Sequence, residues 1–91
     1  MTETTIVTFE LNGTFDEWSK LFDAPEADAM HEEFGIKPLY RGCDKDNRSK
    51  VIVIHQSEPG AFEKFIAKNG EALISHGVKP ETLQTSSWVA S

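Results

Sequence analysis

The longest uninterrupted apolar run in the chain is "VIVI", at positions 51–54, and a histidine follows it directly. β-Branched residues favour extended backbone, and side chains alternate between the two faces of a strand. Val51 and Val53 therefore point to one face, and Ile52 and Ile54 point to the other. A strand with one solvated face would alternate apolar and polar residues. The run predicts a central strand, over Lys50–Gln56, that is covered on both faces.

The rest of the pattern predicts three more strands and two helical regions. Apolar residues at every second position favour strands at residues 4–11, 36–42 and about 82–90. Apolar residues at helical spacing favour helices at residues 15–34 and 61–76. Pro25 cannot donate a hydrogen bond to the preceding turn, so the first region is two short helices or one kinked helix. Asn69-Gly70 leaves open a similar break in the second region.

Several residues mark the ends of these helices. Thr14 and Glu17 have the spacing of a capping box, in which each side chain accepts a hydrogen bond from a free amide of the first turn. Asp23 and Glu26 repeat that spacing before the second segment. Gly35 follows that segment and is expected to close it in a left-handed conformation.

The order β-α-β-β-α-β defines a ferredoxin-like α+β fold, expected as a single domain over residues 1–91. Right-handed crossovers place both helical regions on one face of a four-stranded antiparallel sheet, with the first and third strands central. The other face has no cover from its own chain. The sheet of a second copy is the simplest cover, so the sequence predicts a homodimer through this face. The alternative is a monomer with one exposed apolar patch.

The layout also resembles a known group of proteins. The segments "TFDEW", "FGIKPLYRGCDKDNRSKVIVIHQSEPGAFEKFI" and "ISHGV", followed by a strand, are similar to the dimeric α/β-barrel proteins. That group includes antibiotic-biosynthesis-monooxygenase-like domains and many small uncharacterised bacterial proteins. The resemblance covers nearly the whole chain and contains no catalytic signature. It implies two sheets packed face to face, with a pocket between sheet and helices in each protomer.

Charge and composition remove several classes of partner. Nine Lys and Arg against fifteen Asp and Glu give a net charge of -6, which disfavours nucleic acid. No apolar run approaches the length of a membrane helix, and the first residues do not form a secretory signal. With one cysteine, Cys43, an internal disulfide is excluded and the cytoplasm is the expected location.

No metal or other cofactor is expected. The three histidines and Cys43 lie on different predicted elements, without the spacing of metal ligands. His31 and His76 fall near helix ends, where a surface position beside the helix dipole is expected. In haem-degrading members of the group a histidine of the second helix binds iron, and His76 falls in a comparable region. The tryptophan that accompanies that histidine has no counterpart at the end of the third strand, so haem is not expected.

Six residues are candidates for a site. His55 ends the central strand and could act as a general base near neutral pH, although alternation favours a satisfied core histidine beside Val53. Tyr40 is the second candidate catalytic residue, and it points to the opposite face from Arg41. The candidate ligand-binding residues are the aromatic residues Trp18, Phe22 and Trp88, which could line a pocket, and the polar residue Gln56.

Two functions are compatible with these residues. The first is a homodimeric module that binds a small, largely apolar ligand or makes a regulatory contact. The second is a cofactor-independent monooxygenase, isomerase or cyclase that acts on a small apolar or aromatic substrate. The module is favoured, because the sequence offers no assembled acid, base and electrophile. A pocket of about 300 Å³ that receives both His55 and Tyr40 would favour the enzyme, and a tightly filled helix-sheet layer would favour the module.

Overall fold

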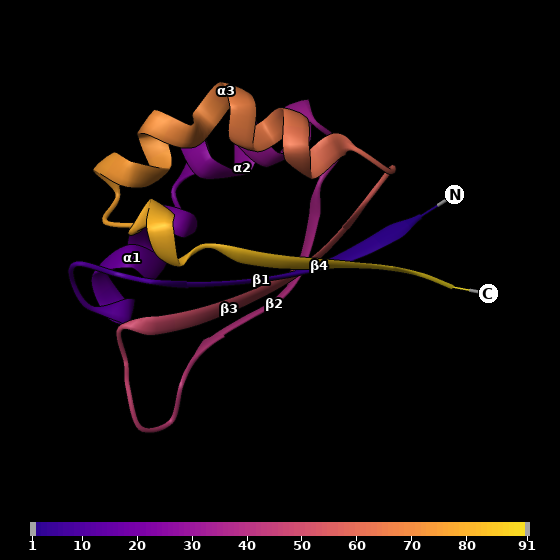
Figure 1. Ribbon diagram of the computed structural model, residues 1–91. Coiled ribbons are helices and arrows are strands. Elements are labelled where there is room, and N and C mark those ends of the chain that lie inside the picture. Colours follow the sequence, from indigo (N-terminus) through magenta and orange to yellow (C-terminus); the bar gives the residue numbers. More distant parts are fainter. Residues whose placement is uncertain (1, 91) are drawn as a thin grey trace.

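The computed structural model describes residues 2–90 as one antiparallel sheet with its helices on one face (Figure 1). The elements are β1 (Glu3–Glu10), α1 (Phe15–Phe22), α2 (Pro25–Glu33), β2 (Lys37–Cys43), β3 (Lys50–Ser57), α3 (Ala61–Ser75), the 3₁₀ helix η1 (Pro80–Thr82) and β4 (Gln84–Val89). The strand order is β2-β3-β1-β4, and every neighbouring pair is antiparallel. The predicted ferredoxin-like α+β fold, with the first and third strands central, is confirmed.

The first helical region is two separate helices. The hydroxyl of Thr14 accepts a hydrogen bond from the Glu17 amide at 3.2 Å, so this half of the predicted capping box is present. Pro25 occupies the first turn of α2, where its missing N–H costs nothing. The break at this proline therefore starts a new helix rather than kinking the old one.

The expected cap of α2 by Asp23 was wrong. The N-cap residue of α2 is Ala24, which makes no side-chain capping hydrogen bond. The Asp23 carboxylate instead accepts a hydrogen bond from the Arg41 guanidinium of β2 at 2.6 Å. An aspartate cap and an arginine pair are both charge-assisted bonds of a carboxylate, and the Asp23 side chain makes the second.

Helix α3 runs without a break through Asn69 and Gly70. The possible interruption at this pair does not occur. Phe62 and Phe65 are buried and fix the helix to the layer below. Burial of two aromatic side chains contributes several times the roughly 1 kcal/mol that glycine costs in a helix.

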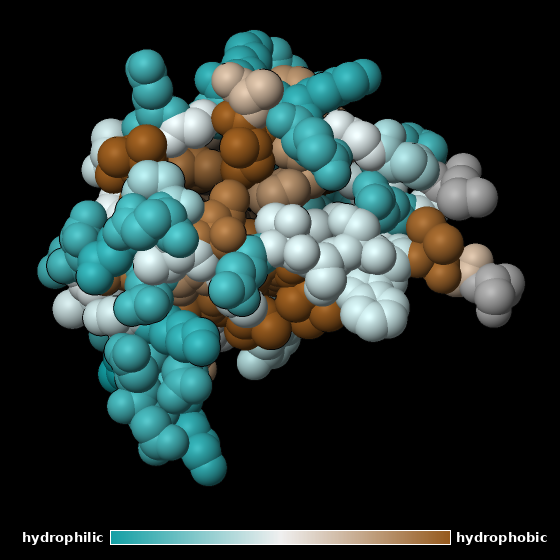
Figure 2. Space-filling view, viewed as in Figure 1, coloured by the Kyte–Doolittle hydropathy of each residue, from teal (hydrophilic) through white to brown (hydrophobic). Residues whose placement is uncertain are grey.

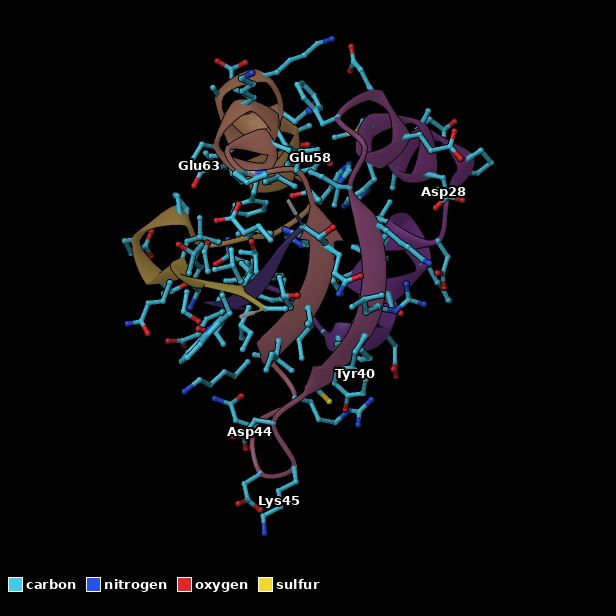
Figure 3. All side chains as sticks on the ribbon, turned by 90° about the vertical axis from the view of Figure 1, so that its right-hand side faces the viewer. Asp28, Tyr40, Asp44, Lys45, Glu58 and Glu63 are labelled. Atoms are coloured by element: carbon cyan, nitrogen blue, oxygen red, sulfur yellow. The ribbon has the colours of Figure 1, made fainter. Side chains whose placement is uncertain are left out.

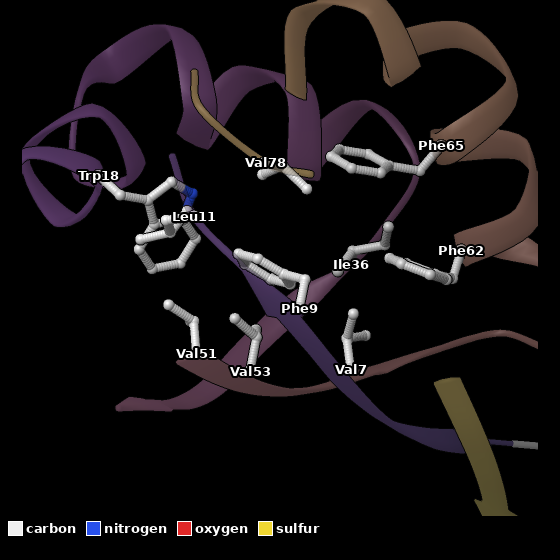
Figure 4. Close-up of a cluster of buried hydrophobic side chains, with 10 residues drawn as sticks. All are labelled: Val7, Phe9, Leu11, Trp18, Ile36, Val51, Val53, Phe62, Phe65 and Val78. Atoms are coloured by element: carbon white, nitrogen blue, oxygen red, sulfur yellow. The ribbon is translucent and has the colours of Figure 1, made fainter. Parts of the chain in front are cut away.

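A single apolar layer lies between the helices and the sheet (Figure 4). The inward face of the sheet contributes alternate residues of its central strands, Val7 and Phe9 from β1 and Val51 and Val53 from β3. The alternation predicted for both strands is therefore confirmed. Trp18 of α1 is 5% exposed and packs edge-on against Phe9, with ring centroids 5.4 Å apart.

The opposite side of the sheet, which we call the open face, is not covered by any element among residues 2–90 (Figure 1). Half-buried isoleucines lie at its centre, and the Tyr40 and Trp88 side chains on the edge strands are 58% and 62% exposed. Beyond the sheet, the β2–β3 hairpin projects away from the helices and carries Asp44 and Lys45 at its tip (Figure 3). The residues of the open face are Thr4, Ile6, Thr8 and Glu10 of β1, Lys37, Tyr40 and Gly42 of β2, Lys50, Ile52, Ile54 and Gln56 of β3, and Gln84, Ser86 and Trp88 of β4.

Gly35 ends α2 with a φ of +66°, as the sequence predicts, and no atom lies within 4 Å of a Cβ built there. We expect Gly35→Ala to lower the free energy of unfolding by about 1–2 kcal/mol, because only the left-handed backbone opposes the side chain. Gly70→Ala is the matched control. Its added Cβ also meets open space, but within a regular helix, so it is expected to raise stability by about 0.5–1 kcal/mol. Urea unfolding of both variants measures the difference, and equal changes would contradict it.

Candidate functional site

A cavity of about 60 Å³ lies between the sheet and the helices. All three α-helices and both central strands contribute to its walls, which are largely aromatic and aliphatic. No lysine, arginine, aspartate or glutamate lines the cavity, and its ionisable residues are His31, His55 and His76. Apolar walls with a few polar groups are typical of small-molecule sites.

His55 is the most deeply buried of these histidines. It lies in β3, opposite Thr5 of β1, and its side chain is on the inward face of the sheet. The residue is 2% exposed, and its ring packs against Phe62 with centroids 4.8 Å apart. Within residues 2–90, its Nε2 atom has no hydrogen-bond partner. The expected core position is therefore correct, but the expectation of a satisfied histidine was wrong, because its surroundings are apolar. A buried polar atom without a partner costs about 1–3 kcal/mol.

His55 is neutral at physiological pH. The pKa of His55 is lowered from 6.5 to about 4, mainly by burial and in smaller part by nearby His31, while Glu3 partly opposes the change. A neutral imidazole offers one donor and one acceptor nitrogen. A general base works best with a pKa near the operating pH. The buried ring is therefore better suited to hydrogen bonding than to proton abstraction.

The pKa of His55 predicts a fall in stability on mild acidification. Between pH 6.5 and about 4 the unfolded chain binds a proton at this position and the folded chain does not. The free energy of unfolding is therefore expected to decrease as pH falls through this window, by up to about 3 kcal/mol. Urea unfolding across the window, compared with a His55→Leu variant that cannot bind this proton, isolates the effect. The same pH slope in both proteins would contradict it.

His31 and His76 lie in the cavity wall rather than on the surface. The His31 ring packs between Phe22 and Phe65, with centroid distances of 5.2 and 4.8 Å. Its Nδ1 donates a hydrogen bond to the Ala27 carbonyl at 2.7 Å, one turn earlier in α2. For His31, these aromatic contacts favour the inward position over the surface position expected from the helix dipole.

For these two histidines, helical spacing was the feature of the sequence that could have indicated an inward position. His31 follows Ala27 by four positions and precedes Phe34 by three, so it shares their inward stripe. Helix α3 has an inward stripe of its own, and this stripe carries Asn69. The amide nitrogen of Asn69 is buried without a hydrogen-bond partner in the described part of the chain. The sequence pattern indicated Asn69 as part of a possible helix break and not as a residue of the site.

Half of the six candidate residues meet at the cavity. Trp18, Phe22 and His55 all line it, although they come from α1 and β3. Trp18 and Phe22 are one turn apart on α1, and their rings are in contact at 5.0 Å. The guanidinium of Arg41 covers the outer side of Phe22 at 4.8 Å.

The other half lies on the open face. Tyr40 pairs with Ile54, Trp88 pairs with Thr4, and Gln56 points away from His55. These three residues are therefore not brought together with His55 in one protomer. The Gln56 amide donates to the Thr4 hydroxyl at 3.3 Å, and the Trp88 indole donates to Ser86 at 3.0 Å.

A β-bulge determines the position of Tyr40. The pairing of β2 with β3 shifts by one residue between Pro38 and Tyr40. With an unbroken ladder from Pro38 opposite His55, Tyr40 would pair with Val53 and face the cavity. The extra residue reverses this direction, since a one-residue shift moves a side chain to the other face. Arg41 takes the inward direction instead.

The geometry supports binding more readily than metal chemistry. The site offers apolar walls, a neutral imidazole without a partner and two further histidines. Among residues 2–90, no three His, Cys, Asp or Glu side chains are grouped so that they could hold a metal ion. No helix in the same range is both long and apolar enough to cross a membrane.

The strand order, with the helices on one face of the sheet, defines a ferredoxin-like α+β domain. The chain belongs to the family described as domain of unknown function DUF3764, whose model matches residues 2–90. No curated protein matches the chain in sequence.

Solved structures share the fold at low sequence identity. A variant of SnoaB, a cofactor-independent oxygenase from Streptomyces nogalater, is 16% identical with a TM-score of 0.65, covering 98% of this chain and 92% of that one. A NIPSNAP family protein from Agrobacterium tumefaciens is 13% identical with a TM-score of 0.66, covering 100% and 94%. A proposed antibiotic biosynthesis monooxygenase from Deinococcus radiodurans is 15% identical with a TM-score of 0.56, covering 100% and 93%. At these identities the comparison establishes the fold alone.

Proposed function

We propose that the protein is a cytoplasmic, homodimeric module that binds a small, largely apolar ligand in the cavity between helices and sheet. The observation that carries this proposal is the Nε2 atom of His55, which is buried in the cavity wall without a partner. Native proteins satisfy nearly all buried polar atoms, and exceptions concentrate at functional sites. A hydrogen bond between a ligand and Nε2 would remove the free-energy cost of burying this atom without a partner.

The cavity limits the size of the ligand. Its volume of about 60 Å³ is below the roughly 150 Å³ of an engineered cavity that binds benzene, and well below the 300 Å³ of drug-sized sites. Hydrophobic residues are visible between α3 and β4, where a ligand could extend toward solvent (Figure 2). A ligand of a few heavy atoms fits the enclosed volume, and a larger one requires α3 to move outward.

A panel of small neutral molecules tests the binding function. At a concentration of 100 times its dissociation constant, a specific ligand stabilises the folded protein by about 2.7 kcal/mol. We expect a thermal shift of wild type, and an equal shift of Glu71→Gln, because Glu71 is exposed on α3 and does not line the cavity. Perturbed amide signals should cluster at β3 and α3. Binding that perturbs only the open face would contradict the proposed site.

The second candidate function is a cofactor-independent enzyme. The observation that favours it is the presence of three histidines in one cavity, together with a fold similar to that of the oxygenase SnoaB. Two observations weigh against it: Tyr40 faces away, and the pKa of His55 is about 4. Oxygen consumption with hydroquinone substrates distinguishes the two functions. Turnover that disappears in His55→Leu would assign the protein to the enzymes.

The open face supports the homodimer. Its isoleucines and two exposed aromatic residues form a surface of the kind found in the centre of protein interfaces. Its charged residues, Glu10, Lys37 and Lys50, lie at the ends of their strands and leave the centre of the face uncharged. A second copy matches this surface because the same apolar residues meet across a two-fold axis. The single cysteine supports the cytoplasmic location.

A further inference from the structure

We infer that the helix-sheet cavity selects its ligand by charge, accepting neutral molecules with a hydrogen-bonding group and rejecting carboxylates and phosphates. This inference rests on the proposed ligand site and names the chemical class that the site takes. Its support comes from the cavity wall, the surrounding cations and the start of α3.

The cavity wall contains no lysine or arginine that could compensate an anion. His55, which carries the nitrogen without a partner, is held neutral by burial. An ionised carboxylate would lose its hydration on entry and find no lysine or arginine in exchange. The cost of burying an unpaired charge far exceeds that of a neutral amide or hydroxyl that gains one hydrogen bond.

Two cations on the helices and strands around the cavity, Arg41 and Lys68, are already paired with carboxylates of the protein. Arg41 covers Phe22 from outside and bonds Asp23 at 2.6 Å. Lys68 on the outer side of α3 is paired with Glu33 of α2. An anionic ligand would have to break such a pair to recruit its cation, which leaves a protein carboxylate without its partner.

The start of α3, a typical position for an anion, is occupied by the protein itself. The amide of Gly60 donates a hydrogen bond to the Glu3 carboxylate at 3.3 Å. The positive end of the helix dipole is therefore already compensated. Glu3 also interacts electrostatically with His55, so its negative charge disfavours an anion bound next to His55. The net charge of -6 adds repulsion at longer range.

Matched pairs of probes test this selectivity. Isobutyramide and isobutyrate have the same size and shape and differ in charge, and benzamide and benzoate form a larger pair. At pH 7 we expect the better amide of the two pairs to bind at least 100-fold more tightly than its carboxylate, measured by amide chemical-shift titration. Equal affinity within that pair would overturn the charge selectivity and leave the ligand site intact. Failure of both amides and of the neutral panel would instead overturn the proposed binding function, and the inference with it.

Two further measurements identify the origin of the selectivity. Lowering the pH from 7 to 5 protonates part of the acid, so its apparent affinity should rise by about tenfold or more, while that of the amide stays constant. Glu3→Gln keeps an oxygen that accepts from Gly60 and should strengthen carboxylate binding about threefold to tenfold. Glu71→Gln makes the same change in net charge on the outer surface of α3 and should alter it less than twofold. Equal effects of the two variants would contradict the role of Glu3.

Discussion

The His55→Leu variant is expected to be more stable than wild type by about 1–3 kcal/mol and to bind the ligand about tenfold to hundredfold more weakly. Both effects have one cause. Leucine fills a similar volume but removes the buried Nε2 atom that lacks a partner within the protein. The same atom is the hydrogen-bonding group of the proposed site. Urea unfolding and a titration with a neutral amide measure the two effects on one sample.

Opposite changes in stability and binding separate function from packing. A histidine that only fills the core would lose stability when replaced, and a ligand site elsewhere would keep its affinity. His55→Gln retains a polar group at this position and is expected to gain little stability. If His55→Leu is destabilised and binds normally, the cavity is not the ligand site. Trends of this kind, in which removal of a functional residue raises stability, are common at binding sites.

The Ile54→Asp variant is expected to be monomeric at concentrations where wild type is a dimer, with a dissociation constant raised more than a thousandfold. Ile54 lies near the middle of the open face, opposite Tyr40 on β2. A two-fold axis would bring two introduced carboxylates into the same apolar interface. Burial of each unpaired charge costs several kcal/mol, and 1.4 kcal/mol corresponds to a factor of ten.

Light scattering after size exclusion measures this effect directly. Wild type should give twice the chain mass of 10.2 kDa at micromolar concentration, and Ile54→Asp should give 10.2 kDa. Thr85→Asp is the matched control, because Thr85 is an exposed residue of β4 that pairs with Val7 and so faces the helix side. This control should remain dimeric. A wild-type mass of 10.2 kDa would contradict the dimer through the open face.

The architecture was predictable because backbone and burial preferences agree along the chain. The run at positions 51–54 required cover on both faces, and the structure buries Val51 and Val53 under the helices. Pro25 and Gly35 determine where α2 begins and ends through their fixed and permissive backbone angles, respectively. These are local effects, and they act in the same way in any fold.

The composition of the site was only half predictable. Trp18, Phe22 and His55 reached the cavity because helical and strand periodicity places them inward. Tyr40 did not, because the bulge after Pro38 reverses the direction of every following residue in β2. Pro38 lacks a donor for the ladder, which is compatible with an edge strand with or without a bulge, and the bulge decides the face on which Tyr40 lies.

The polar content of the cavity depends on packing between distant segments. The position of His31 against Phe65 results from the contact of α2 with α3, which sequence periodicity does not specify. His55 lacks a hydrogen-bond partner at Nε2 because the side chain packed against it is Phe62. Phe62 lies seven residues later in the sequence, in the helix layer above the sheet. Such contacts determine whether a buried histidine is satisfied or left available for a ligand.

The most direct measurement is the ¹⁵N spectrum of the His55 imidazole, recorded with and without a saturating neutral amide. The free protein should show a neutral ring down to about pH 4, and the amide should shift the Nε2 signal while the backbone of the open face stays unchanged. An Nε2 signal that does not respond to any ligand the protein binds would show that this nitrogen is not the recognition group, and the proposed site would have to be abandoned.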